Sequence, residues 1–267
     1  MTADADAEIV VRQVTEGVHT ISRPFWRWGW FPFGGRSTIV TLQNGSLWIL
    51  ASTPLTPLTK QTLDSLGGRV AYLVAPDAEH SLFLSQWAKS YPDAKVIGVP
   101  PLVPKRRGEV TFHGVYGLEE HSKPPFGYED EIDACYFSGF ANKDVAFLHK
   151  KSKTLIQADL LFNFPPKEQF ERLAPGSEGW LRFLGIKGGK VPCLSEWFSP
   201  WENGHKWFLW AASQDKAAMA RDAKTVAGWD FNRIVPCHGD VIEEKGKEAF
   251  LEAYKWHLEQ AEKQKSD

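Results

Sequence analysis

Short apolar runs that each end beside a potential metal ligand are the feature that most constrains the fold of this chain. The runs span residues 70–74, 154–158 and 231–237. Runs of this length and composition predict buried strands. The candidate ligands that follow them are Asp77, Glu79, His80, Asp159 and His238. Because carboxylates and imidazoles at neighbouring strand ends can bind one ion, the sequence predicts a metal site at one edge of a sheet.

Length, composition and charge narrow the class of protein. With 267 residues, of which 43% are apolar, the chain can bury a sizeable core, and we expect one domain over residues 1–267. The formal net charge of -2 gives no reason to expect a nucleic-acid or membrane partner. The N-terminus lacks a basic-then-apolar signal pattern and no apolar run could span a bilayer, so we expect a cytoplasmic protein.

The order of predicted elements favours an α+β fold with sheets inside and helices outside. Asn44-Gly45 predicts a tight hairpin turn between strands 38–42 and 46–51. Helical spacing and helix stop signals predict helices over 57–66, 81–90, 213–227 and 243–263. Residues 163–204 are irregular and aromatic, which is typical of a functional loop.

The segment 23–36 holds six aromatic residues and too many glycines and prolines for a regular element. We expect it to form a lid that binds an apolar or aromatic small molecule through Trp26, Trp28, Trp30, Phe31 and Arg27. Arg23, Arg27 or Arg36 can pair with a carboxylate of that ligand. The candidates for the opposite wall are Trp180, Trp197, Trp201 and Trp207. The alternative is a hydrophobic flap or the contact surface of a homodimer.

With these motifs in order, the chain resembles the metallo-β-lactamase fold superfamily. That superfamily carries His-x-His-x-Asp-His after a strand, then a Gly-His, a strand ending in a bridging Asp, and a late strand ending in His. The matching positions here are Ala75-x-Asp77-x-Glu79-His80, Gly139-Phe140, Asp159 and His238. The resemblance implies a four-layer αββα sandwich with its metal site at one edge of the sheets.

The resemblance also implies that one of the superfamily's two metal sites is lost. The first site falls on Ala75, Asp77 and Phe140, and neither alanine nor phenylalanine can bind a metal ion. The second site retains a potential ligand at every position: Glu79, His80, Asp159 and His238. We therefore expect one divalent ion, with zinc preferred and iron or manganese as alternatives.

Two carboxylates on the first turn have several possible roles. Asp77 is a candidate substitute ligand, and whichever of Asp77 and Glu79 is not bound to metal is a candidate general base. Either carboxylate can instead cap the helix predicted from residue 81. His80, Asp159 and His238 can likewise remain as a buried hydrogen-bond network of a site that no longer binds metal.

The resulting hypothesis is a mononuclear, metal-dependent hydrolase acting on an apolar or aromatic ester, lactone or related acyl substrate. A non-hydrolytic metal enzyme, such as an isomerase, a lyase or an oxygen-using catalyst, is the first alternative. A catalytically inactive protein that binds a ligand in the aromatic pocket is the second. The fold alone does not choose among them.

Overall fold

The structure of the chain is a computed structural model that describes residues 6–118, 126–173, 189–191 and 196–263. The larger sheet has the strand order β1-β2-β5-β6-β7-β8-β9. Its strands are β1 (Val10–Thr15), β2 (Val18–Arg23), β5 (Gly35–Thr41), β6 (Leu47–Leu50), β7 (Val70–Val74), β8 (Lys95–Gly98) and β9 (Gly114–Val115). The first four pair antiparallel and the rest are parallel from β6 onward.

A second sheet packs against the first and has the order β10-β11-β12-β13. Its strands are β10 (Ile132–Tyr136), β11 (Val145–His149), β12 (Thr154–Gln157) and β13 (Arg233–Pro236). β12 and β13 run parallel, and the other pairs run antiparallel. A two-stranded ribbon, β3 (Trp26–Arg27) with β4 (Phe31–Pro32), projects from the chain between β2 and β5.

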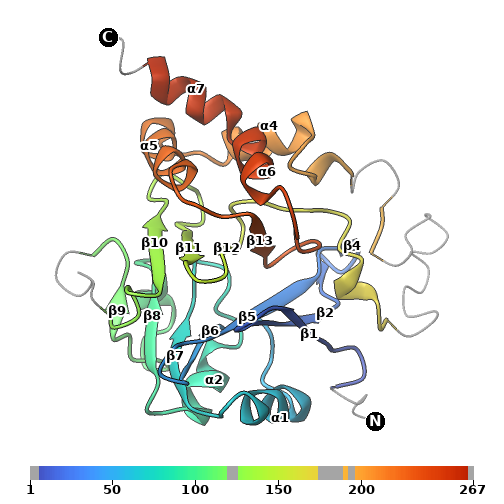
Figure 1. Cartoon of the computed structure of the whole chain (residues 1–267), viewed down its shortest axis with the longest axis vertical. Helices are drawn as coiled ribbons and strands as arrows, with labels where there is room; N and C mark the ends of the chain where they lie inside the picture. The colour runs from blue at the N-terminus through green and yellow to red at the C-terminus, as the bar shows by residue number, and fades with distance from the viewer. Residues whose placement is uncertain (1–5, 119–125, 174–188, 192–195, 264–267) are drawn as a thin grey trace.

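Helices cover the outer faces of the two sheets, so the molecule has four layers (Figure 1). The first group consists of α1 (Pro57–Ser65), α2 (Leu84–Ser90) and the short α3 (Leu102–Lys105). Of these, α1 and α2 cover the outer face of the larger sheet. The second group, beyond the smaller sheet, consists of α4 (Asn203–Ala211), α5 (Lys216–Ala227), α6 (Gly246–Ala253) and α7 (Lys255–Lys263). Two 3-10 turns, Glu168–Phe170 and Glu196–Phe198, lie in the long aromatic segment.

The two sheets share a core, and a second core lies under the late helices. Trp48, Phe147 and Ile156, which come from both sheets, are fully buried in the first core. In the second core, Leu155 and Phe250 pack between the smaller sheet and the late helices. Burial of both faces explains the nearly continuous apolar composition of the central strands.

Local signals account for most of the predicted element ends. Asn44 turns the β5–β6 hairpin by accepting hydrogen bonds from Ser46, and Gly45 adopts a φ of +76°. Thr56 caps α1, and Asp215 caps α5 through two backbone N–H groups. The predicted hairpin and both of these helices are confirmed, although α5 begins at residue 216 and not at 213.

Two helix predictions need correction. The helix expected from residue 81 begins only at Leu84, because residues 77–83 form turns arranged around the Asp77 carboxylate. The single final helix expected over 243–263 is two helices that break at Tyr254. The buried ring of Tyr254 stacks on Phe250 and its hydroxyl donates to the Leu160 carbonyl, which holds the break in place.

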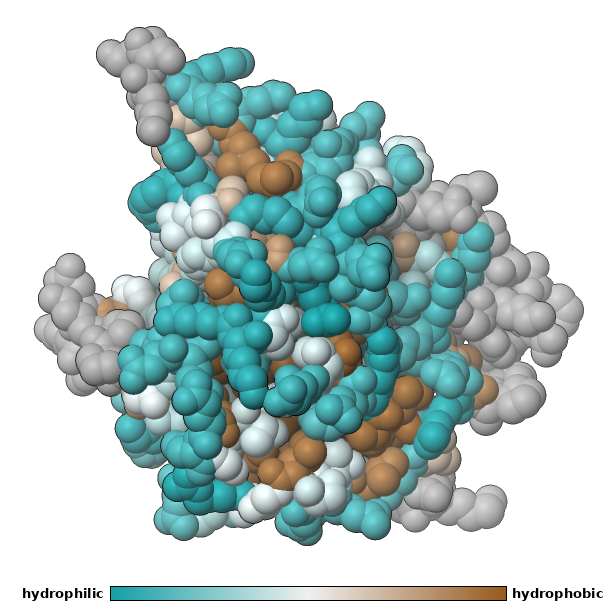
Figure 2. All heavy atoms as spheres, viewed as in Figure 1, coloured by the Kyte–Doolittle hydropathy of each residue, from teal (hydrophilic) through white to brown (hydrophobic). Residues whose placement is uncertain are grey.

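Strand direction brings the predicted site together. β7 ends at Val74 and leads into residues 77–80, while β12 and β13 run parallel and lead to residues 159 and 238. The ends of these strands therefore meet at one edge of the sandwich. On the face shown in Figure 2, hydrophilic side chains predominate, with smaller apolar areas between them. None of the described helices is both long enough and apolar enough to span a bilayer.

Candidate metal centre

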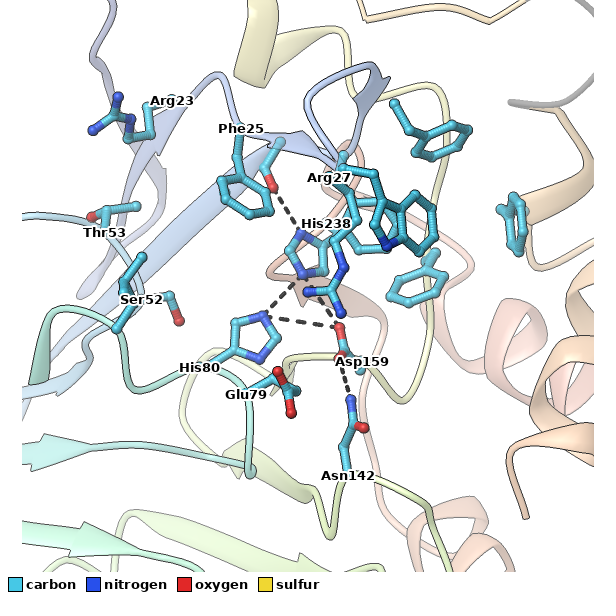
Figure 3. Close-up of a pocket in the computed structure, with 18 of the residues that line it drawn as sticks. Arg23, Phe25, Arg27, Ser52, Thr53, Glu79, His80, Asn142, Asp159 and His238 are labelled. Atoms are coloured by element: carbon cyan, nitrogen blue, oxygen red, sulfur yellow. Dashed lines mark hydrogen bonds and ion pairs between the residues drawn. The ribbon is translucent and has the colours of Figure 1, made fainter. Parts of the chain in front are cut away.

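His80, Asp159 and His238 converge at this edge (Figure 3). The two Nε2 atoms of His80 and His238 lie 2.9 Å apart. Oδ1 of Asp159 lies 3.3 Å from Nε2 of His238 and 3.9 Å from Nε2 of His80. All three side chains are largely buried, so three donor atoms face one small volume.

Hydrogen bonds made by the Nδ1 atoms of His80 and His238 determine the tautomers of the two imidazoles. Nδ1 of His238 lies 2.8 Å from the Gly34 carbonyl oxygen, which can only accept, so this nitrogen is the donor. Nδ1 of His80 lies 2.8 and 2.9 Å from the two carboxylate oxygens of Asp77 and donates as well. When both rings are neutral, each therefore directs an Nε2 lone pair at the other. Outer hydrogen bonds of this kind orient histidine ligands at metal sites.

The Asp159 carboxylate completes the donor set. Its Oδ2 accepts a hydrogen bond from Nδ2 of Asn142 at 2.5 Å, and its backbone N–H donates to the Asp144 carboxylate. Its buried Oδ1 has no hydrogen-bond partner among the described residues. An unsatisfied buried carboxylate oxygen beside two imidazole lone pairs is costly without a cation. The donor set of two nitrogens and one oxygen therefore fits a divalent metal ion.

The charges of the three side chains reinforce one another. Burial by itself lowers the pKa of His80, but the carboxylates of Asp77 and Asp159 outweigh it and raise the pKa to about 10. Burial by itself raises the pKa of Asp159, but His80 and His238 outweigh it and lower the pKa to about 2. Burial lowers the pKa of His238. Without a metal ion, a proton on His80 can bridge the two rings, and a metal ion would take its place.

Asp77 lies behind His80 and not in the cavity. Its carboxylate is fully buried and accepts from the backbone N–H groups of Glu79 and His80, at 2.8 and 2.7 Å, as well as from the His80 ring. These contacts combine the predicted capping role with an orienting role toward His80. The structure thus gives Asp77 an orienting position in place of the predicted ligand or general-base position.

Glu79 is separate from the three converging ligands. Its side chain is 46% exposed, and its Oε1 lies 4.0 Å from Nζ of Lys105. Three of the four predicted metal ligands are therefore brought together, and Glu79 is not among them. Glu79 also lines the cavity, and its predicted role as a base stays a prediction.

Sequence reasoning missed two polar residues next to Asp159. Asn142 comes from the turn after β10 and holds Oδ2 of Asp159. Asp144 is fully buried, and burial together with Asp77 and Asp159 raises its pKa well above the usual range. Asparagine is a weak motif residue, but a carboxylate directly before the apolar strand 145–149 was a usable signal.

A cavity of about 810 Å³ opens over the three candidate ligands. Phe33 packs on the His238 ring with centroids 4.3 Å apart. The other aromatic residues that line the cavity are Phe25, Trp28, Trp30, Phe31, Phe83, Phe140, Phe162, Phe198 and Phe208. An apolar enclosure with a few polar groups at one end is the usual form of a small-molecule site.

The aromatic lid lines the cavity, with two exceptions. Trp28, Trp30, Phe31 and Arg27 line it, and their role in binding a substrate stays a prediction. Trp26 does not, because it packs edge-on against Phe170 with centroids 5.1 Å apart. Arg36 is also absent, because its buried guanidinium donates to the carbonyls of Pro236 and Gly239 and pairs with Glu168. Arg36 therefore braces the loop around His238.

Phenylalanines beside the lid line the cavity, and not the tryptophans that the sequence suggested for an opposite wall. Phe162, Phe198 and Phe208 line it, and they belong to one cluster with Phe31 and Phe33 of the lid. Trp197, Trp201 and Trp207 are 62%, 47% and 65% exposed and lie outside the lining. Trp180 falls outside the described residues.

Comparison with known proteins supports the fold and leaves the activity open. The family model "Domain of unknown function (DUF4336)" matches residues 34–170, which is half of the chain. No curated protein matches.

Solved structures that resemble the chain include metallo-β-lactamases from three organisms. The Pontibacter korlensis enzyme has a TM-score of 0.59 and 10% identity, with 94% of this chain and 99% of that chain covered. The Hirschia baltica enzyme has a TM-score of 0.59 and 10% identity, with coverages of 94% and 98%. FIM-1 from Pseudomonas aeruginosa, in a mono-zinc form, has a TM-score of 0.58 and 12% identity, with coverages of 95% and 96%. The predicted metallo-β-lactamase-like fold is confirmed.

Proposed function

This chain belongs to the family described as Domain of unknown function (DUF4336), and we propose that it is a mononuclear, metal-dependent hydrolase. The proposed ligands are His80, Asp159 and His238, and the proposed substrate is an apolar or aromatic ester, lactone or related acyl compound. One observation carries the proposal: three buried lone pairs converge, and outer hydrogen bonds fix two of them in direction.

One ion suits the residues at this edge better than two. Two positions of the superfamily's first site carry Ala75, which has no ligand atom, and Phe140, which is buried and lines the cavity. The remaining position is Asp77, whose carboxylate already accepts from His80 and two backbone N–H groups. We propose zinc for the site that remains, with iron(II) or manganese(II) as alternatives.

A bound divalent ion would supply Lewis acidity and lower the pKa of a coordinated water toward about 7. The chain's own groups do the remaining work. Asp77 and the Gly34 carbonyl hold the two imidazoles in the orientation that presents Nε2 to the cavity. Glu79, at the rim, is the proposed acceptor of a proton from water. The phenylalanine walls exclude bulk water and bind the apolar part of the substrate.

The test is reconstitution followed by a panel of aryl and alkyl esters and lactones. Protein freed of metal and reloaded with Zn²⁺, Fe²⁺ or Mn²⁺ is assayed beside H80A, H238A and the control H113A, whose imidazole is exposed and lies outside the cavity lining. We expect turnover to depend on metal and to fall at least about 100-fold in the two ligand variants but not in the control. Equal turnover by metal-free and reloaded protein would refute the proposal.

A second candidate is a ligand-binding protein that needs no metal. It is favoured by the 2.9 Å contact between His80 and His238, which a single proton can bridge, and by the pKa of His80 near 10. It predicts tight binding of aromatic ligands by metal-free protein and no hydrolysis of any ester or lactone after reloading.

A further inference from the structure

Arg27 brings a positive charge into the cavity next to a site that is itself built for a cation. It ends β3 and lines the cavity. In Figure 3 its side chain extends from the β3–β4 ribbon toward His80, Asp159 and His238. The centroid of the Trp28 ring lies 5.7 Å from its guanidinium carbon, which is a cation–π contact. A guanidinium and a metal ion at one end of a cavity repel each other.

No carboxylate of the described residues pairs with Arg27 within the cavity or elsewhere. The two acidic side chains that line the cavity are Glu79, which lies 4.0 Å from Lys105, and Asp159, which faces the histidines and Asn142. Another lining cation, Arg106, pairs with Glu109 at 3.2 Å. Arg27 is an exposed residue of the ribbon, none of the described carboxylates pairs with its guanidinium, and its side chain is directed toward the three candidate ligands.

We propose that Arg27 binds a carboxylate of the substrate, so that the substrate class is an anionic acyl compound with an apolar or aromatic body. A carboxylate held there would reduce the repulsion between the guanidinium and the ion. The carboxylate could also accept two parallel hydrogen bonds from the planar guanidinium. The body of the substrate would lie on Phe162, Phe198 and Phe208. The inference rests on the proposed function for the reacting acyl group.

Arg23 does not share this role. It also lines the cavity, but in Figure 3 it lies on the far side of Phe25, away from the three ligands. Its Nε donates to the Pro24 carbonyl at 3.3 Å. Arg27 is thus the residue placed to select an anion close to the acyl group, and it acts by positioning the substrate.

The experiment compares 4-phenylbutyrate with its neutral isostere 4-phenylbutyramide by calorimetry on zinc-loaded and metal-free protein. We expect the wild type to bind the anion about 10- to 100-fold more tightly than the amide, and R27Q to lose that preference. R27K should retain part of it. R69Q is the matched control, because Arg69 is exposed and precedes β7 at the end remote from residues 77–80; it should behave as the wild type.

Two results would overturn the inference. One is equal affinity of the wild type for the two compounds. The other is a preference for the anion that survives in R27Q but disappears when zinc is removed, because the carboxylate would then be binding the ion. Zinc content and turnover of a neutral ester are measured on the same preparations. Zinc-dependent turnover without an anion preference rejects this inference alone, and an Arg27-dependent preference without turnover rejects the proposed function alone.

Discussion

Replacing Asp77 with asparagine tests whether the proposed metal binding depends on the orientation of His80. The change keeps the shape of a fully buried side chain and leaves one oxygen to accept from the backbone of Glu79 and His80. The other oxygen, 2.8 Å from Nδ1 of His80, becomes an NH₂ group. A donor then faces Nδ1 at that position. The ring either keeps only its 2.9 Å contact with Oδ1, which also accepts from two backbone N–H groups, or moves its proton to Nε2.

Either response weakens the site, because a ring held by one shared oxygen is oriented less firmly and a protonated Nε2 has no lone pair for a metal ion. Loss of an outer hydrogen-bond partner typically costs 10- to 100-fold in metal affinity, which corresponds to about 1.4–2.8 kcal/mol. We expect D77N to fall in this range. Zinc affinity is measured by competition with a chromophoric chelator at pH 7.5, with circular dichroism to establish that the variant is folded.

D222N is the matched control for D77N. Asp222 is also buried, but it pairs with Arg221 at 2.8 Å and contacts neither His80 nor His238. We expect its zinc affinity to equal that of the wild type. A D77N protein that is folded and binds zinc within about twofold of the wild type would refute the assigned role of Asp77.

Two further predictions concern other parts of the structure. Gly34 has a φ of +72°, and a Cβ at this position in G34A would lie 1.9 Å from Oε1 of buried Gln169. We expect urea unfolding to show a stability lower by about 1–3 kcal/mol, and zinc binding to weaken because the Gly34 carbonyl orients His238. Unchanged stability and zinc affinity would contradict this. Burial lowers the pKa of His205 to about 3 from 6.5, and its Nε2 accepts from Phe162 N–H at 2.8 Å. The unfolded state therefore takes up the proton first, so stability should fall by up to about 1.4 kcal/mol per pH unit below pH 6.5. H205Q should flatten that fall between pH 6 and 4.5, and an equal slope in both proteins would count against it.

Much of the site could be predicted because ligands at strand ends leave a local signal. An apolar run followed by His80, Asp159 or His238 is visible in the sequence, and parallel strands carry such residues to one edge. The role of Asp77 could not be predicted in the same way. Its choice between ligand, base and cap depends on the conformation of a single turn, which brings its carboxylate within 2.8 Å of the His80 ring.

The lid shows where a periodicity argument would have helped. Trp26 and Arg27 are consecutive residues of a strand, and consecutive strand side chains point to opposite faces. The two side chains could not both line the cavity, and in the structure Arg27 lines it whereas Trp26 packs on Phe170. The break between α6 and α7 left no such signal, because buried residues continue at helical spacing on both sides of Tyr254, from Ala253 to His257 and Ala261.

The most direct test of the account is the metal content of the purified chain after reloading with zinc and removal of excess ion. Elemental analysis should give one zinc per chain for the wild type, with loss of that zinc in H80A and H238A and retention in D222N. Two zinc ions per chain would contradict the single site inferred from Ala75 and Phe140. No retained zinc, iron or manganese in the wild type would contradict the metal centre itself.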